Sequence, residues 1–123
     1  LLKCTSTYPA SAKDSNLLTI PELKKRFNVN VGLSDHTLGI GAAVASVALG
    51  ATIIEKHFTL SRKEGGVDAA FSMEPDEMLS LVKEVKSASE ALGKVTFGCS
   101  KNEKPSTIFR RSIYVIERNL MRF

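Results

Sequence analysis

The chain contains two histidines, and each follows an apolar run typical of a buried β-strand. His36 follows Val31-Gly32-Leu33 in the stretch VGLSDHT, and His57 lies near the end of ATIIEKHF at residues 51–58. Two neutral imidazoles on adjacent strands can hold one divalent metal ion, with water and substrate oxygens completing its shell. The alternative is a pair of strand-end histidines with ordinary hydrogen bonds, and the pattern alone leaves both interpretations open.

Alternation along a β-strand sorts the neighbours of these histidines, because successive side chains face opposite sides of the sheet. Ser34 shares a face with His36, whereas Asp35 faces the other way and is expected to anchor its own loop. On the first predicted strand, Ser6 falls on the corresponding face. Sites in parallel α/β folds form at the carboxyl ends of strands, so we expect both serines and both histidines to converge at one edge.

Three other charged residues on the predicted strands have structural as well as chemical interpretations. Glu55 is either a proton-transfer group or a buried carboxylate paired with a neighbouring lysine. Lys3 and Lys56 lie where an aldolase could use a lysine to form a Schiff base. Alternation, however, directs both lysines away from the expected site.

Two loops carry further candidates. Tyr8-Pro9 is either a rigid turn or a place where an aromatic ring covers a substrate. Gly65-Gly66 predicts a mobile loop, and Asp68 after it is either solvated or closes on a ligand.

Strand-like and helix-like patterns alternate three times over the first 93 residues. Three strand–helix units in succession imply parallel strands joined by right-handed crossovers, as in doubly wound sheets and (β/α)8 barrels. A full barrel needs about 250 residues, so the chain holds about three of its eight units. No GxGxxG fingerprint follows a strand, which disfavours a dinucleotide-binding sheet. The predicted strands are residues 1–6, 29–35 and 51–58, and the predicted helices are residues 16–27, 39–50 and 75–92.

The composition is that of an ordinary globular protein, with 43% hydrophobic and 24% charged residues among 123. A net charge of +4 without a long basic block does not predict nucleic-acid binding. No apolar run approaches the ~20 residues of a membrane helix. Cys4 and Cys99 lack a CxxC spacing, so we expect free thiols in a cytoplasmic protein, with Cys4 buried.

The chain begins with LLKCTS, inside a strand pattern, and ends with IYVIERNLMRF, where a strand-like run at residues 110–117 has just finished. A whole domain rarely starts and stops in this way, so we expect a piece of a longer protein. Residues 94–109 are predicted to form a linker, and residues 110–123 the start of a second unit.

Several motifs, in order, resemble those of the sialic acid synthase family from residue 1 to about residue 117. The matching blocks are KCTSTYP, GLSDHT, ALGATIIEKHFTL, GGVDAAFSMEP and ALG. The loop SRKEGGVDAAFSMEP and the later FRRSIYVIE look most like the pseudaminic acid synthase branch. The resemblance implies that residues 1–93 are the last three βα units of a (β/α)8 TIM barrel. A linker and an incomplete antifreeze-like domain at residues 110–123 would follow.

The resemblance also implies an activity, in which phosphoenolpyruvate condenses with an open-chain N-acetylated amino sugar and phosphate is released. The expected sugar is a 2,4-diacetamido-2,4,6-trideoxy hexose. A divalent metal is expected, Mn²⁺ in preference to Mg²⁺ or Co²⁺, and so is a domain-swapped homodimer. The matching residues are His36 and His57 for the metal, Ser6 and Ser34 for phosphoenolpyruvate, and Tyr8 and Asp68 for the sugar.

The family's phosphate-binding lysines lie on strands that precede this stretch, so the isolated chain is expected to be inactive. Three alternatives stay open. They are a non-catalytic truncated fragment or assembly module, an N-acetylneuraminate synthase that takes N-acetylmannosamine, and a Schiff-base aldolase.

Overall fold

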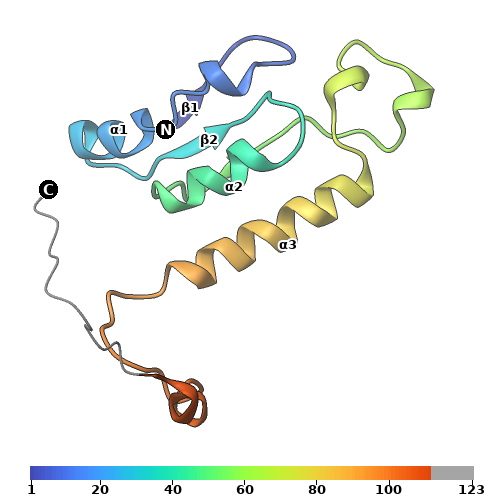
Figure 1. The fold of residues 1–123 in the computed structure, drawn as a ribbon. Coiled ribbons are helices and arrows are strands. Elements are labelled where there is room, and N and C mark those ends of the chain that lie inside the picture. Colours follow the sequence, from blue (N-terminus) through green and yellow to red (C-terminus); the bar gives the residue numbers. More distant parts are fainter. Residues whose placement is uncertain (112–123) are drawn as a thin grey trace, which may run out of the picture. The chain divides into compact units, whose positions relative to one another are not determined.

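The computed structural model describes residues 1–111 (Figure 1), and the chain divides into two compact units between Gly93 and Lys94. The described part of the second unit contains one 3₁₀ helix, η4 (Lys104–Phe109), within the predicted linker. The strand predicted at residues 110–117 and the domain predicted at 110–123 lie outside the described residues, apart from their first two positions. Among residues 1–111, no helix has both the length and the hydropathy needed to cross a membrane.

Three short parallel strands form the sheet of the first unit, in the order β1-β2-β3. Each lies inside a predicted strand and is shorter than predicted at both ends. Cys4, Ser34 and Glu55 pair across the sheet and form one layer. The prediction of a parallel α/β arrangement is confirmed, and it fits a partial barrel. The strands are β1 (Leu2–Cys4), β2 (Gly32–Ser34) and β3 (Ile54–Glu55).

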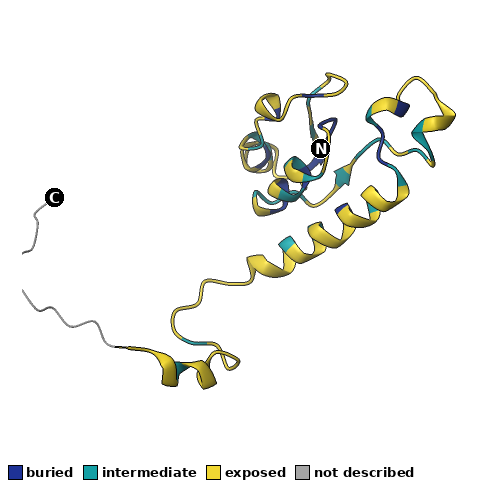
Figure 2. Ribbon diagram, turned by 45° about the vertical axis from the view of Figure 1, so that its right-hand side comes forward, coloured by how far each residue is buried: buried dark blue, intermediate teal, exposed yellow. Residues whose placement is uncertain are grey.

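A 3₁₀ helix, η1 (Ala12–Asp14), and the helix α1 (Thr19–Phe27) connect β1 to β2. Ile20 of α1 is fully buried against Val31 and Leu33, which lie two residues apart and therefore face the same side of β2. Every residue from 31 to 37 is buried, since β2 lies between the other two strands (Figure 2).

The helices α2 (Gly41–Ala48) and α3 (Pro75–Leu92) pack against each other. Ala43 of α2 is completely buried in a cluster with Leu81 of α3, because the small side chains of α2 allow a close approach. The predicted bounds of α3 are confirmed, and most of its surface is exposed (Figure 2).

The helices cover one face of the sheet and leave the other open. Ile54 pairs with Leu33 across the sheet and packs against the cluster between α2 and α3, so it lies on the covered face. On the opposite face, here called the open face, Cys4 and Glu55 are exposed. The prediction that Cys4 is buried is therefore wrong, because β1 carries it on the side that no helix covers.

Gly32 lies on the open face, where the neighbouring strands close over it. A Cβ at this position would lie 2.4 Å from the carbonyl oxygen of Ile53 and 2.8 Å from Cδ2 of Leu2. The same Ile53 oxygen accepts a hydrogen bond from the N–H of Leu33 at 2.9 Å. A side chain at residue 32 would therefore displace the hydrogen-bonded backbone that joins β2 to β3.

The segment between β3 and α3 contains η2 (Arg62–Glu64) and η3 (Ala69–Phe71) and is tied to the start of α3. Arg62 Nε donates to the carbonyl oxygen of Ser72 at 2.9 Å, and its guanidinium group pairs with Glu74 and Glu77. Glu74 and Glu77 form a capping box, in which the N–H of Glu74 donates to Glu77 Oε2 at 2.8 Å. This backbone bond, assisted by Arg62, holds the pKa of Glu77 below its ordinary 4.5.

We expect Gly32→Ala to lower the free energy of unfolding by about 1–3 kcal/mol, the range typical of overpacking. Gly41→Ala is the matched control, because an added Cβ there meets no atom within 4 Å. It is expected to leave stability unchanged or raise it by up to about 1 kcal/mol. Urea unfolding of both variants measures the difference, and equal stabilities would contradict the close approach at Gly32.

The lowered pKa of Glu77 predicts a pH dependence of stability. A carboxylate with a lowered folded pKa stabilises the protein above its unfolded pKa, and this contribution is lost as the pH falls through and below 4.5. Glu77→Gln should remove this part of the dependence, by less than about 1 kcal/mol because the side chain is 45% exposed. Chemical denaturation between neutral and acidic pH tests this, with Glu84→Gln in α3 as control. Identical pH profiles of wild type and Glu77→Gln would refute it.

Candidate functional site

His36 and His57 extend from neighbouring strands and meet just beyond the last paired residues of the sheet. Their ring centroids lie 5.2 Å apart. The Tyr8 ring lies beside both, at 4.3 Å from His36 and 5.8 Å from His57. Phe71 completes the group, with its ring 5.6 Å from Tyr8 and 5.0 Å from His57. These four residues, Tyr8, His36, His57 and Phe71, are called the ring cluster below.

His36 is held in one orientation by the backbone of the neighbouring loop. Its Nδ1 lies 2.9 Å from the carbonyl oxygen of Thr5 and 4.0 Å from Sγ of Cys4. A carbonyl only accepts hydrogen bonds, so Nδ1 carries the proton in the neutral ring. The lone pair is then on Nε2, which is the atom left to act as a ligand.

His57 lies beside an acidic group from the loop after β3. Its Nδ1 is 3.6 Å from Oδ2 of Asp68, whose side chain is half exposed. The structure thus brings Asp68 next to His57, 11 positions earlier in the chain. The loop is held back against the strand end, since Met73 N–H donates to the carbonyl oxygen of His57 at 2.8 Å.

Ser34 and Glu55 form a hydrogen bond in the layer next to the ring cluster. Ser34 Oγ donates to Glu55 Oε1 at 2.6 Å. The interpretation of Glu55 as a buried carboxylate paired with lysine is wrong, because Glu55 is exposed and its partner is Ser34. The neighbouring Lys56 pairs instead with Asp35 on the covered face, at 2.9 Å.

Ser6 lies at the edge of the site. Its Oγ is exposed and 3.6 Å from Sγ of Cys4. Cys4 in turn faces His36, so Ser6 is connected to the ring cluster through one intervening side chain.

Two features of the site were missed by sequence reasoning. Phe71 closes the ring cluster, yet in the sequence it is one apolar residue in a loop, and only its aromatic character within a polar, Gly-rich segment could have drawn attention to it. The pair of Asp35 and Lys56 was missed because it joins residues 21 positions apart.

The donor set of the ring cluster fits a loosely held divalent ion. Within residues 1–111, no group of three or more His, Cys, Asp or Glu side chains could hold a metal. The ring cluster offers two imidazoles as candidate ligands, and the hydrogen bond of His36 within residues 1–111 is made by Nδ1, not Nε2. Nitrogen ligands completed by oxygens suit Mn²⁺ and similar ions.

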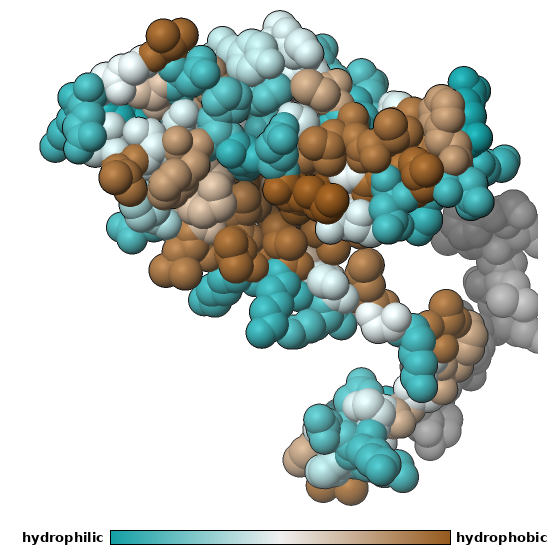
Figure 3. All heavy atoms as spheres, turned by 180° about the vertical axis from the view of Figure 1, so that it is seen from behind, coloured by the Kyte–Doolittle hydropathy of each residue, from teal (hydrophilic) through white to brown (hydrophobic). Residues whose placement is uncertain are grey.

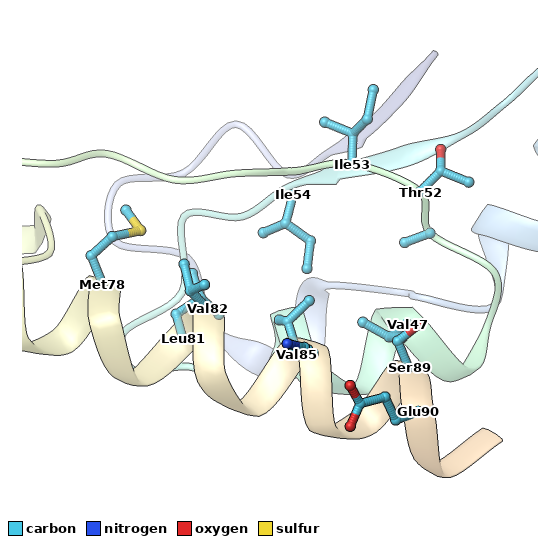
Figure 4. Close-up of a pocket in the computed structure, with 12 residues that line it drawn as sticks. Val47, Thr52, Ile53, Ile54, Met78, Leu81, Val82, Val85, Ser89 and Glu90 are labelled. Atoms are coloured by element: carbon cyan, nitrogen blue, oxygen red, sulfur yellow. The ribbon is translucent and has the colours of Figure 1, made fainter. Parts of the chain in front are cut away.

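A large cavity of the first unit lies elsewhere. It is a groove of about 840 Å³ between α3 and the strand β3 (Figure 4). Its walls are mainly apolar, with Ile54, Leu81 and Val85 among the lining residues, and it contains none of the predicted site residues. Apolar side chains also gather in a broad area of the face seen in Figure 3. The groove also includes Thr52, Lys86, Ser89 and Glu90, and none of these is a predicted site residue.

The chain matches the model of the NeuB family over residues 1–97. A pseudaminic acid synthase of Campylobacter jejuni is 46% identical over 113 residues, which cover 92% of this chain and 33% of that protein. An N,N'-diacetyllegionaminic acid synthase of Legionella pneumophila is 44% identical over 123 residues, covering 99% of this chain and 34% of that protein. The chain thus spans about a third of the length of the curated relatives it matches.

A solved structure shares the fold. The crystal structure of an N-acetylneuraminic acid synthetase from Leptospira borgpetersenii, in complex with citrate, superposes with a TM-score of 0.76 and 38% sequence identity. The superposition covers 89% of this chain and 39% of the other.

We expect added Mn²⁺ to broaden the imidazole NMR signals of both His36 and His57, because both rings would bind the same ion. Replacing either histidine by alanine should weaken the broadening at the other. Asp14→Asn, an exposed residue of η1, is the control and should change nothing. Broadening at one histidine that persists unchanged after loss of the other would contradict a shared site.

Proposed function

The chain belongs to the NeuB family, and on this premise we propose that it is part of a synthase that condenses phosphoenolpyruvate with an open-chain N-acetylated amino sugar. The products would be a nonulosonic acid and phosphate. The names of the relatives support this, since they are synthases of pseudaminic, legionaminic and N-acetylneuraminic acids. The observation that carries the proposal is the meeting of His36 and His57, 5.2 Å apart and flanked by Tyr8 and Asp68.

We propose further that residues 1–93 are the last three βα units of a (β/α)8 barrel. The parallel strand order, the helices on one face and the exposed opposite face support this placement. The remaining units would cover the open face and the groove beside β3, which accounts for the exposure of both. In this proposal the linker leads to an antifreeze-like domain, the whole protein is a cytoplasmic domain-swapped homodimer, and the isolated chain is inactive.

Each site residue has a role in this proposal. Ser34 and Ser6 would lie near phosphoenolpyruvate, and the oxygen of Ser34 keeps lone pairs available because its own hydrogen is donated to Glu55. Tyr8 would cover the sugar and exclude water from one side of the reacting centre. Asp68 would accept hydrogen bonds from sugar hydroxyl groups, which suits its half-exposed carboxylate.

The reaction joins C3 of phosphoenolpyruvate to the aldehyde carbon of the sugar, and the aldehyde oxygen takes up a proton. Water then adds at C2 of the phosphoenolpyruvate-derived part, and phosphate leaves with cleavage of its C–O bond. A divalent metal held by His36 and His57, with Mn²⁺ as the first choice and Mg²⁺ or Co²⁺ as alternatives, would supply a Lewis acid for the aldehyde. The residues of this chain would hold the two carbons at reacting distance, which is a large part of such catalysis.

A Schiff-base aldolase finds no support in the two strand lysines. The side chain of Lys56 is only 3% exposed and donates hydrogen bonds to three oxygens, so its amine is not free to attack a carbonyl. Lys3 donates to Oγ1 of Thr5 at 2.6 Å. A non-catalytic assembly module is the second candidate, because residues 1–111 contain no group of three or more His, Cys, Asp or Glu side chains that could hold a metal.

Phosphate release by the whole protein that contains this chain tests the proposal, with phosphoenolpyruvate, Mn²⁺ and either a 2,4-diacetamido-2,4,6-trideoxy hexose or N-acetylmannosamine. We expect the diacetamido sugar to be used, and His36→Ala and His57→Ala each to reduce kcat/KM at least about 100-fold. This exceeds the 10–100-fold loss typical of residues that only support metal ligands. Asp14→Asn should retain full activity. Folded histidine variants with wild-type activity would contradict the metal-binding role of His36 and His57. Absence of turnover with every sugar tested would favour the non-catalytic assembly module.

A further inference from the structure

We infer that Asp35 and Lys56 are positioning residues, whose buried ion pair on the covered face of the sheet fixes the separation of His36 and His57 on the other face. Each partner lies immediately before one of the two histidines in the chain. Because side chains alternate, the pair and the histidines face opposite sides of the same two strand ends. For its metal readout, the inference rests on the proposed function.

The pair is almost completely removed from solvent and fully satisfied. Lys56 Nζ lies 2.9 Å from Asp35 Oδ2, and the two side chains are 3% and 2% exposed. The same ammonium donates to the carbonyl oxygens of Thr37 at 2.7 Å and Gly39 at 3.0 Å. Asp35 Oδ1 accepts from the N–H of Thr37 at 2.9 Å. All three ammonium hydrogens are used, so the group is held from three directions.

The backbone ladder stops before it reaches the histidines. The strand β3 is only two residues long, and its last bond to β2 is from the N–H of Asp35 to the carbonyl oxygen of Glu55 at 2.9 Å. Beyond this bond, among the described residues, the hydrogen bonds between the two strand ends all start from Lys56 Nζ, which binds Asp35 and the carbonyl oxygens of Thr37 and Gly39. Because the backbone bonds between β2 and β3 end before the histidines, the two strand ends could shift or separate there. In our inference the ion pair prevents this movement.

The other anchors of the histidines tie each of them to a different loop. The carbonyl oxygen of His36 accepts from the N–H of Ala10 at 2.8 Å, whereas that of His57 accepts from the N–H of Met73 at 2.8 Å. These bonds fix each strand end to its own neighbour and not to the other strand end. The separation of the two strand ends, and with it that of the imidazoles, therefore depends on Lys56 and its three oxygen partners, while the Tyr8 ring packs beside both histidines.

A contribution to stability alone does not explain the pair. Replacing a buried ion pair by apolar side chains of similar size is often neutral for stability or even favourable. An apolar pair lacks directional bonds. Apolar contact lets the two strand ends shift past each other, whereas an ammonium group with three directed hydrogen bonds does not. Stability and the spacing of the histidines can thus be separated by experiment.

The test uses the double variant Asp35→Leu/Lys56→Met in the whole protein that contains this chain. Glu22→Gln is the matched control, because it breaks the exposed ion pair with Arg26 on α1, 3.4 Å long. Three quantities are compared with wild type: the midpoint of urea unfolding, the dissociation constant for Mn²⁺ from electron paramagnetic resonance, and nuclear Overhauser effects between the two imidazole rings in metal-free protein.

We expect the double variant to unfold at about the wild-type midpoint. It should bind Mn²⁺ about 10–100-fold more weakly, as is typical when residues that orient metal ligands are replaced. It should also lose the nuclear Overhauser effects between the two imidazole rings. The control should match wild type in all three. If the double variant does not fold, Lys56→Arg replaces it, because it keeps the buried charges paired while changing the geometry of the donors, and a weaker loss of the same two signals is expected.

Wild-type Mn²⁺ affinity and intact contacts between the imidazoles in the folded variant would overturn the inference. If wild type itself does not bind Mn²⁺, the proposed metal role fails. The metal-free contacts then decide the positioning role by themselves, since their loss supports it and their persistence overturns it.

Discussion

The arrangement of the site depends on one buried ion pair. Asp35 and Lys56 join the carboxyl ends of β2 and β3 at the point where the backbone ladder stops. Removing one partner of such a pair leaves a buried charge without compensation and costs about 3–5 kcal/mol. The pair therefore holds the loop of residues 35–39 and both strand ends together. In our inference it also fixes the positions of His36 and His57 relative to each other.

The open face shows how the layers below the histidines support this arrangement. Gly32 lets Leu2 and Ile53 close over the central strand. The next layer is the Cys4, Ser34 and Glu55 row, with a hydrogen bond between the last two. The ring cluster follows at the edge. Stacked layers of inward side chains are the usual interior of a (β/α)8 barrel, and a site at the carboxyl end of its strands is the usual position.

Alternation was a reliable guide to the faces of the strands but not to the partners of their side chains. It placed Ser34 and His36 together and turned Asp35 and Lys56 away, because the period of two is a local property of extended backbone. It did not indicate that Lys56 pairs with Asp35 and Glu55 with Ser34. Those contacts depend on the register between strands, which is set by packing.

The sequence by itself determined the order of the elements, the bounds of α3 and the positions of both histidines at strand ends. These features follow from apolar runs and their periods, which depend only on residues close together in the sequence. The tertiary structure alone decided that Phe71 joins the ring cluster, that Asp68 lies beside His57 and that Cys4 is exposed. These outcomes follow from how loops fold back on the strands and from which face the helices cover. Both depend on contacts between distant segments that no local pattern encodes.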